Sequence, residues 1–347
     1  MLETMLAKTL YSLSLLGLVI LVNGCDIHSP RLRMGTLPTP PPGPRFYEPN
    51  NLGKHSYSYN PFEKNGIVYT CKAGHIDITH LRWSADNTRY FIRKTYETLV
   101  KKDEGFTFNI SIERSRHKVQ FSYPEYWDSI SHKTKEKIAE IIAFEVGPYL
   151  VFNATIWHEI LTWFGVHFIG VEPEFNSSFS WEDTYSNLLG TKLAVEAIKD
   201  TKHNYNKAMT LAIDRKLKEL GAQPKSIAIY ASEKMRGEWY TGYLLVDTIR
   251  KNMDIGLDDG YINPVLVPGI CYGADPEPLA VPTIDILPIY GFSMKYEIYP
   301  KEWERGKILR TIYPDGNGEK IGPDKHFNKL MYYIKRQAVR EYDCIID

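Results

Sequence analysis

The chain has 347 residues, and its 42 lysines and arginines are balanced by 42 aspartates and glutamates. This length is enough for one large domain or two smaller ones. The balanced charge, with no basic stripe along the sequence, creates no field that would attract nucleic acid or an acidic lipid surface. We therefore expect no nucleic-acid partner.

The amino-terminal segment has the features of an export signal. Leu10–Val22 is almost continuously apolar, but it is shorter than the about 20 residues that a membrane-spanning helix needs. It leads into Val22–Cys25, which resembles a bacterial lipobox, where the cysteine is acylated and becomes the first mature residue. A membrane-anchor helix and an unlipidated signal peptide are the alternatives.

The sequence thus predicts a signal peptide over residues 1–24 and a palmitate-type lipid anchor on Cys25 that binds the lipid bilayer. We expect a lipoprotein of the bacterial cell envelope that faces the periplasm. The sequence does not decide between inner and outer membrane, although Asp26 resembles an inner-membrane retention signal. An envelope substrate or protein partner cannot be named from the sequence.

A segment rich in proline, glycine, asparagine and tyrosine follows. Its centre, Pro38–Pro44, has the composition of a stiff polyproline-type spacer. The sequence therefore predicts a Pro-rich tether over residues 25–62 and a single domain over residues 63–347. At roughly 3 Å per residue, such a tether could hold the domain up to ~100 Å from the bilayer.

Residue patterns predict the elements of that domain in chain order. A strand over 66–71 precedes a helix that Asp77 or Thr79 caps and that runs to about Lys101. A hairpin spans 106–123, and an apolar stretch beginning near 134 should form a buried helix pair, kinked or divided at Pro148. Later elements are helices over 180–199 (begun by a capping box from Ser180 to Asp183), 204–220, 244–250 and 326–342, and strands over 226–230 and 293–299, with a loop over 254–282.

Three cysteines remain after Cys25, so at least one of them is unpaired. A Cys271–Cys344 disulfide is one pairing that an export compartment permits, but the sequence does not establish it. Cys71 could alternatively act as a nucleophile with His75, although a cysteine at the end of a strand is an unusual nucleophile.

The most informative polar residues interrupt the apolar helix at His158 and Glu159. Burying an adjacent histidine and glutamate is costly unless they are paired or bound to a metal. The zinc-protease pattern needs a second histidine four residues on, where this chain has Thr162. His158 must therefore find its partners elsewhere, either as a metal ligand or in a structural polar network.

A second group lies in Gly74–His80, where His75, Asp77 and His80 are potential metal ligands within six residues. The alternative is that Asp77 only caps the helix and His80 is partly exposed. The third group comprises Glu182, which could point at the others, Asp183, which could complete a helix cap, and Glu145, which an unbroken helix would place on the face of Glu159.

These motifs together resemble an uncharacterised family of bacterial lipoproteins, the domain of unknown function 4056. The matching segments are 74–80, 158–165, 179–190, 256–260 and 303–309. The resemblance would cover nearly the whole mature chain. It implies membership of that family and no mechanism.

We expect a mainly helical single α+β domain with a few short strands and hairpins. The leading hypothesis is a metal-dependent hydrolase of the cell envelope that uses a divalent metal such as zinc. His75, Asp77, His80 and His158 would be the metal ligands, and Glu159 or Glu182 the catalytic base, with Glu145 and Asp183 as further candidates. The rival hypothesis is a non-enzymatic binding or assembly lipoprotein whose polar residues form a buried network.

Overall fold

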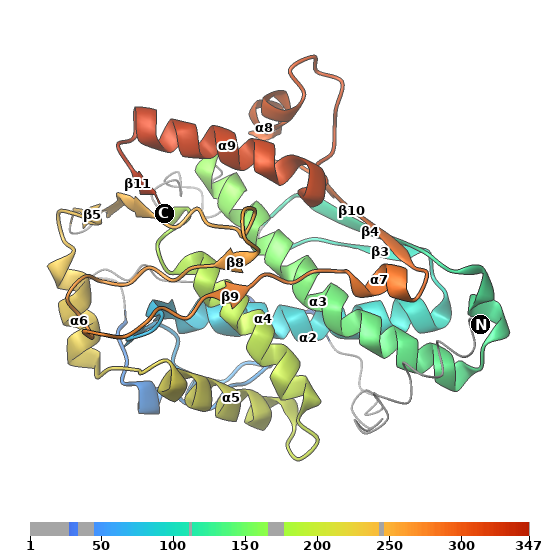
Figure 1. Ribbon diagram of the computed structural model, residues 1–347, viewed down its shortest axis with the longest axis horizontal. Helices are drawn as coiled ribbons and strands as arrows, with labels where there is room; N and C mark the ends of the chain where they lie inside the picture. The colour runs from blue at the N-terminus through green and yellow to red at the C-terminus, as the bar shows by residue number, and fades with distance from the viewer. Residues whose placement is uncertain (1–27, 34–44, 111–112, 166–176, 243–245, 347) are drawn as a thin grey trace.

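The computed structural model describes residues 28–33, 45–110, 113–165, 177–242 and 246–346. Cys25, the signal peptide and the proline run of residues 38–44 lie outside the described residues. Three helices form the centre of the molecule, α2 (Ile78–Lys101), α3 (His132–Trp163) and α4 (Asp183–Lys199), and α2 packs against both of the others (Figure 1).

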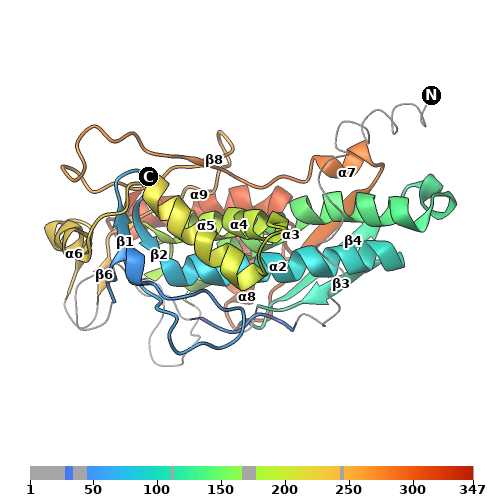
Figure 2. The ribbon, with the colours of Figure 1, turned by 90° about the horizontal axis from the view of Figure 1, so that it is seen from below.

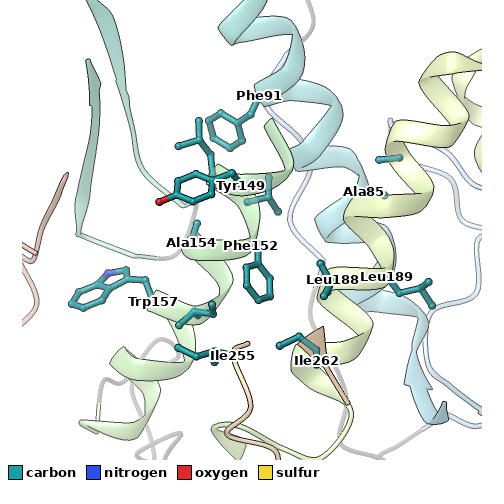
Figure 3. Close-up of a cluster of buried hydrophobic side chains, with 14 of the residues drawn as sticks. Ala85, Phe91, Tyr149, Phe152, Ala154, Trp157, Leu188, Leu189, Ile255 and Ile262 are labelled. Atoms are coloured by element: carbon teal, nitrogen blue, oxygen red, sulfur yellow. The ribbon is translucent and has the colours of Figure 1, made fainter. Parts of the chain in front are cut away.

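The main core lies where these three helices meet. Phe91 of α2, Trp157 of α3 and Leu188 of α4 contribute side chains to it (Figure 3). Two glycines allow the helices to approach closely. A Cβ atom on Gly190 would lie 2.1 Å from the carbonyl oxygen of Leu81, and one on Gly147 would lie 2.9 Å from a backbone nitrogen of α2.

A three-stranded antiparallel sheet covers one end of the helices, in the order β10–β4–β3 (Figure 1). The strands are β3 (Gly105–Phe108), β4 (Arg116–Ser122) and β10 (Ser293–Tyr299). Buried residues alternate along β4, as expected of a strand with one face on the core. The predicted hairpin and the predicted strand over 293–299 are therefore confirmed, although β3 ends at Phe108.

The remaining elements surround this frame, and together they confirm the predicted mainly helical α+β fold. Asp77 and Asn204 cap α2 and α5 through their side chains, as predicted for Asp77. The further helices are η1 (Pro49–Asn51), η2 (Glu125–Ser129), α5 (Tyr205–Glu219), α6 (Lys225–Lys234), α7 (Ile286–Ile289), α8 (Arg305–Ile312) and α9 (Pro323–Glu341). The short strands are β1 (Ile67–Thr70), β2 (Gly74–Asp77), β5 (Tyr240–Thr241), β6 (Asp247–Thr248), β7 (Arg250–Lys251), β8 (Tyr261–Ile262), β9 (Leu279–Ala280) and β11 (Ile345–Ile346).

Three predicted elements are wrong. Pro148 does not divide the apolar stretch, because α3 continues through it and every residue from Val146 to Trp157 is buried among neighbouring elements. The strand predicted over 226–230 lies in α6, whose buried Ala228, Ala231 and Ser232 follow the helical period and face the core. The helix predicted over 244–250 is replaced in its described part by β6 and β7, which pair with other strands.

Helix α3 is the one helix in the described ranges that is long and apolar enough to cross a membrane by length and composition. However, 78% of its most apolar window is buried inside the fold. Its apolar character is thus accounted for by the core, as predicted for this stretch, although it forms one helix rather than a pair.

The predicted tether over residues 25–62 does not hold for residues 45–62. Phe46 and Leu52 are buried in the core, and the backbone of Phe46 pairs with Ile67 at the edge of β1. Burial of these apolar side chains fixes the segment on the domain. The domain therefore begins before residue 63.

Candidate active site

Ionisable side chains from four segments meet at one end of the helical core. Asp77 ends β2, His80 lies in the first turn of α2, Glu159 lies near the end of α3, and Glu182 and Asp183 begin α4. All four acids are buried. The predicted candidates from three separate motifs therefore lie close enough to interact electrostatically.

His80 is held by two of these carboxylates. Its Nδ1 lies 2.7 Å from Oδ1 of Asp183 and 3.7 Å from Oδ2 of Asp77. Burial alone would lower the pKa of His80, but the charges of Asp183 and Asp77 outweigh it and raise the pKa to about 10. The His80 side chain is 26% exposed, so a protonated imidazole is presented at the edge of the cluster.

Ser180 connects the two acids at the start of α4. Its Oγ lies 2.9 Å from Oε1 of Glu182 and 2.8 Å from Oδ2 of Asp183. A hydroxyl has one proton, so it can donate fully to only one carboxylate and must accept from the other. Burial and the charges of Asp183 and Asp77 raise the pKa of Glu182 well above its usual range, which favours a shared proton on this pair of acids.

This arrangement replaces the predicted capping box. The residue before α4, Glu182, makes no side-chain hydrogen bond that caps the helix, and the Ser180 hydroxyl contacts the two carboxylates instead of a backbone N–H. Asp183 contacts His80 rather than completing a cap. The second carboxyl oxygen of Glu182 is buried without a hydrogen-bond partner among the described residues.

Glu159 accepts a 2.6 Å hydrogen bond from the backbone N–H of Phe179. Phe179 adopts a left-handed backbone conformation with φ 51°, unusual for a bulky residue, which turns the chain toward Ser180. Burial and the neighbouring charge of Asp183 raise the pKa of Glu159 to about 7, against the opposing effect of His158 and His80. Glu159 can therefore both take up and release a proton near neutral pH.

His158 points to a different acid, Glu113. Its Nδ1 lies 3.0 Å from Oε1 of Glu113, which is buried in the segment before β4. Burial would lower the pKa of His158, but the hydrogen bond and charge of Glu113 raise it. The other oxygen of Glu113 lies 3.8 Å from Nε2 of His117, whose Nδ1 bonds the Tyr296 hydroxyl at 2.7 Å.

The sequence motifs missed Glu113, His117 and Lys251. Lys251 in β7 is buried, and its Nζ donates to the carbonyl oxygen of Ser178 and to Thr248 Oγ1. Burial lowers the pKa of Lys251 to about 8, although the acids of the cluster oppose this effect. The one available signal was the position of Lys251 within a short strand. Lysine is rarely buried there without partners.

Two of the predicted site residues lie apart from the cluster. His75 accepts a hydrogen bond from Trp181 Nε1 at 3.3 Å and faces the carbonyl oxygen of Ala228 at 3.4 Å. Burial among aromatic rings lowers the pKa of His75 to about 4, so it is neutral. Glu145 is exposed, and 14 positions along α3 separate it from Glu159 by about 21 Å.

The metal site predicted from His75, Asp77, His80 and His158 is therefore not assembled. Both ring nitrogens of His75 are used within the fold, one facing the Ala228 carbonyl oxygen and the other accepting from Trp181. Over the described ranges, no group of three or more histidine, cysteine, aspartate or glutamate side chains is arranged to hold a metal ion. The donor set does not fit a divalent metal, and we derive no chemistry from one.

Cys71 is not a nucleophile, because it forms a disulfide with Cys271, with Cα atoms 5.3 Å apart. Of the cysteines that the structure describes, Cys344 is the free one, so the pairing Cys271–Cys344 that the sequence also permitted is not formed. The bond joins the end of β1 to the loop after β8, and it links two segments 200 positions apart.

The family model described as "Protein of unknown function (DUF4056)" matches residues 43–247. The chain belongs to this family. The matched residues include the acids and histidines of the cluster from Asp77 to Asp183, whereas Lys251 and the segments 256–260 and 303–309 lie beyond them. No curated protein and no solved structure matches the chain.

Proposed function

We propose that this protein is an exported, lipid-anchored hydrolase of the bacterial cell envelope that works by acid–base catalysis. The observation behind the proposal is the pairing of two histidines with buried carboxylates, His80 with Asp183 and His158 with Glu113, beside a glutamate whose pKa is about 7. A carboxylate on Nδ1 fixes the ring orientation and raises the basicity of the other nitrogen.

Each group has a role that fits its protonation state. Glu159 is the base that takes a proton from the attacking water. Protonated His80 stabilises the negative charge that develops on the carbonyl oxygen of an ester or amide. His158, whose charged form Glu113 stabilises, returns a proton to the leaving group. Water is consumed and the acyl bond is broken. Glu159 then releases its proton and His158 takes one up from solvent, which restores both groups.

The rival role, a purely structural network in a binding or assembly lipoprotein, explains the cluster less well. A structural network gains stability only when each member is fully paired. Here one buried oxygen of Glu182 has no partner within the described part of the chain. Glu159 and Glu182 both have raised pKa values, which means that burial of their charged forms costs stability. Such costs are typical of groups kept for their chemistry.

Export and anchoring are supported by independent features. The apolar segment and lipobox-like Val22–Cys25 lie outside the described residues, but the Cys71–Cys271 disulfide is typical of an oxidising compartment. We propose that Cys25 is acylated and that the domain faces the periplasm, and Asp26 favours the inner membrane. Acyl chains on one cysteine would anchor it stably.

Hydrolysis of p-nitrophenyl acetate, and of isolated murein sacculi, by the purified protein tests the proposal. Glu159→Gln should lower kcat/KM about 10²- to 10⁴-fold, the usual contribution of a general base. His203→Ala is the matched control, because His203 also bonds an aspartate, Asp200, but on the surface. Absence of turnover by the wild-type protein, or equal turnover by Glu159→Gln, would contradict the proposed hydrolase.

A further inference from the structure

The amino-terminal end of the described chain is fixed on the domain by buried ion pairs. Arg33 is buried, and its guanidinium contacts the carboxylates of Glu63, at 3.2 Å, and of Asp86. The carbonyl oxygen of His28 accepts a 2.6 Å hydrogen bond from the Tyr57 hydroxyl. Buried charges with partners on both sides hold their segment firmly, because separating them would leave unpaired charges.

This attachment limits how far the domain can lie from a lipid anchor. His28 lies three residues after Cys25 in the sequence. A fully extended chain of three residues spans at most about 11 Å. The tether predicted from sequence would allow ~100 Å. Since 28–33 is bound to the domain, an anchor on Cys25 would place this side of the domain directly at the bilayer.

The surface around the fixed segment has the composition of a membrane-contacting face. Leu32, Tyr59 and Phe62 are 47%, 80% and 79% exposed. Tyr59 lies close enough to Arg31 to interact with it electrostatically, and Arg31 pairs with Glu63. The exposed side chains therefore lie around the place where residues 28–33 bind the domain. The blue amino-terminal segments run together beside α2 in Figure 2.

The charges of this face fit an anionic lipid surface. Residues 53–62 contain no aspartate or glutamate, and Lys54 among them is exposed. Glu63, which follows, is buried beneath the face and neutralised by arginines. Aromatic side chains favour the membrane–water interface, and lysine favours anionic headgroups.

We propose that the face formed by Leu32, Lys54, Tyr59 and Phe62, here named the anchor face, lies on the lipid bilayer next to acylated Cys25. This inference rests on the lipid anchor of the proposed function and adds the orientation of the domain. Exposed Trp303 precedes α8, and α8 lies at the edge of the molecule away from the blue amino-terminal segments in Figure 1, so this part would face the aqueous periplasm.

Spin labels in the lipidated full-length chain, reconstituted in phosphatidylethanolamine–phosphatidylglycerol vesicles, test the orientation. A nitroxide on Ser58→Cys probes the anchor face, and one on Trp303→Cys is the control, both with Cys344→Ser. We expect a several-fold higher ratio of oxygen to nickel-chelate collisions at position 58 than at position 303. Tyr59→Asp with Phe62→Asp should return position 58 to aqueous values.

Mass spectrometry of the same sample separates the two claims. An unacylated amino terminus would contradict the lipid anchor and, with it, the orientation. An acylated chain whose label at position 58 is as accessible to the chelate as that at position 303 would contradict the anchor face alone.

Discussion

The three histidines of the sequence motifs have different properties because different groups touch them. His75 lies among aromatic rings, so burial keeps it neutral, whereas His80 and His158 each face a buried carboxylate that raises their pKa. The sequence placed His80 next to Asp77 correctly. It could not identify Glu113 as the partner of His158, because 45 positions separate them and the contact depends on how the segment before β4 lies against α3.

Glu113→Gln should lower the pKa of His158. The glutamine can still accept the Nδ1 hydrogen bond, but it removes the charge that opposes the effect of burial. A folded-state pKa above the unfolded value stabilises the fold at low pH, and this stabilisation is lost as the pH rises through the folded pKa. NMR titration of His158 should show this fall in its pKa.

An unchanged pKa of His158 in Glu113→Gln would mean that Glu113 does not control its protonation.

At the scale of elements, the close approach of α2 and α4 at Gly190 positions His80 beside Asp183. Gly190→Ala should destabilise the protein by about 1–3 kcal/mol, because its methyl group would overlap the Leu81 carbonyl and force the helices apart. Chemical denaturation measures this change. Gly306→Ala in α8 is the control, because its Cβ would meet only the Arg310 side chain at 3.6 Å and should not destabilise the fold.

A Gly190→Ala variant as stable as Gly306→Ala would show that α2 and α4 are less tightly packed than the structure indicates.

Local sequence signals correctly predicted those elements whose local conformational preference agrees with their packing in the fold. Asp77 correctly marked the start of α2, and the strand predicted over 293–299 is β10. Two signals failed because packing outweighed them. Pro148 was accommodated within α3, and the isoleucines of 226–230 lie in a helix whose small residues face the core. Periodicity alone does not separate these cases.

At the scale of the whole molecule, the disulfide joins two distant parts of the chain. Replacing Cys71 and Cys271 together by serine should lower the free energy of unfolding by about 2–5 kcal/mol, since the unfolded chain loses a constraint between segments 200 positions apart. Thermal unfolding measures the loss. Cys344→Ser is the control, because Cys344 is free, and a double variant as stable as that control would contradict the assigned pairing.

Only some of the residues that meet at the candidate active site could be predicted from the sequence. Sequence reasoning identified Asp77, His80, Glu159, Glu182 and Asp183 as candidates from separate segments. It could not exclude His75 or Glu145, and it could not find Lys251. Whether a residue belongs to the cluster depends on how β2, α3, α4 and β7 meet in three dimensions. Local patterns contain no information about that arrangement beyond the type of each element.

The central claim is that Glu159 acts as a catalytic base, although ionising it in its buried position destabilises the folded state. Its folded-state pKa of about 7 lies above the unfolded value, so its ionisation destabilises the fold increasingly as the pH rises toward 7. Glutamine mimics the protonated acid and can still accept the Phe179 hydrogen bond. The difference in stability between Glu159→Gln and the wild type therefore depends on pH.

Urea denaturation of both proteins at pH 5 and pH 8 is the most direct test. We predict that the Glu159→Gln variant is more stable by less than about 1 kcal/mol at pH 5 and by up to about 3 kcal/mol at pH 8. A variant that is less stable than the wild type at pH 8 would show that ionised Glu159 supports the fold, and would contradict the proposed catalytic role.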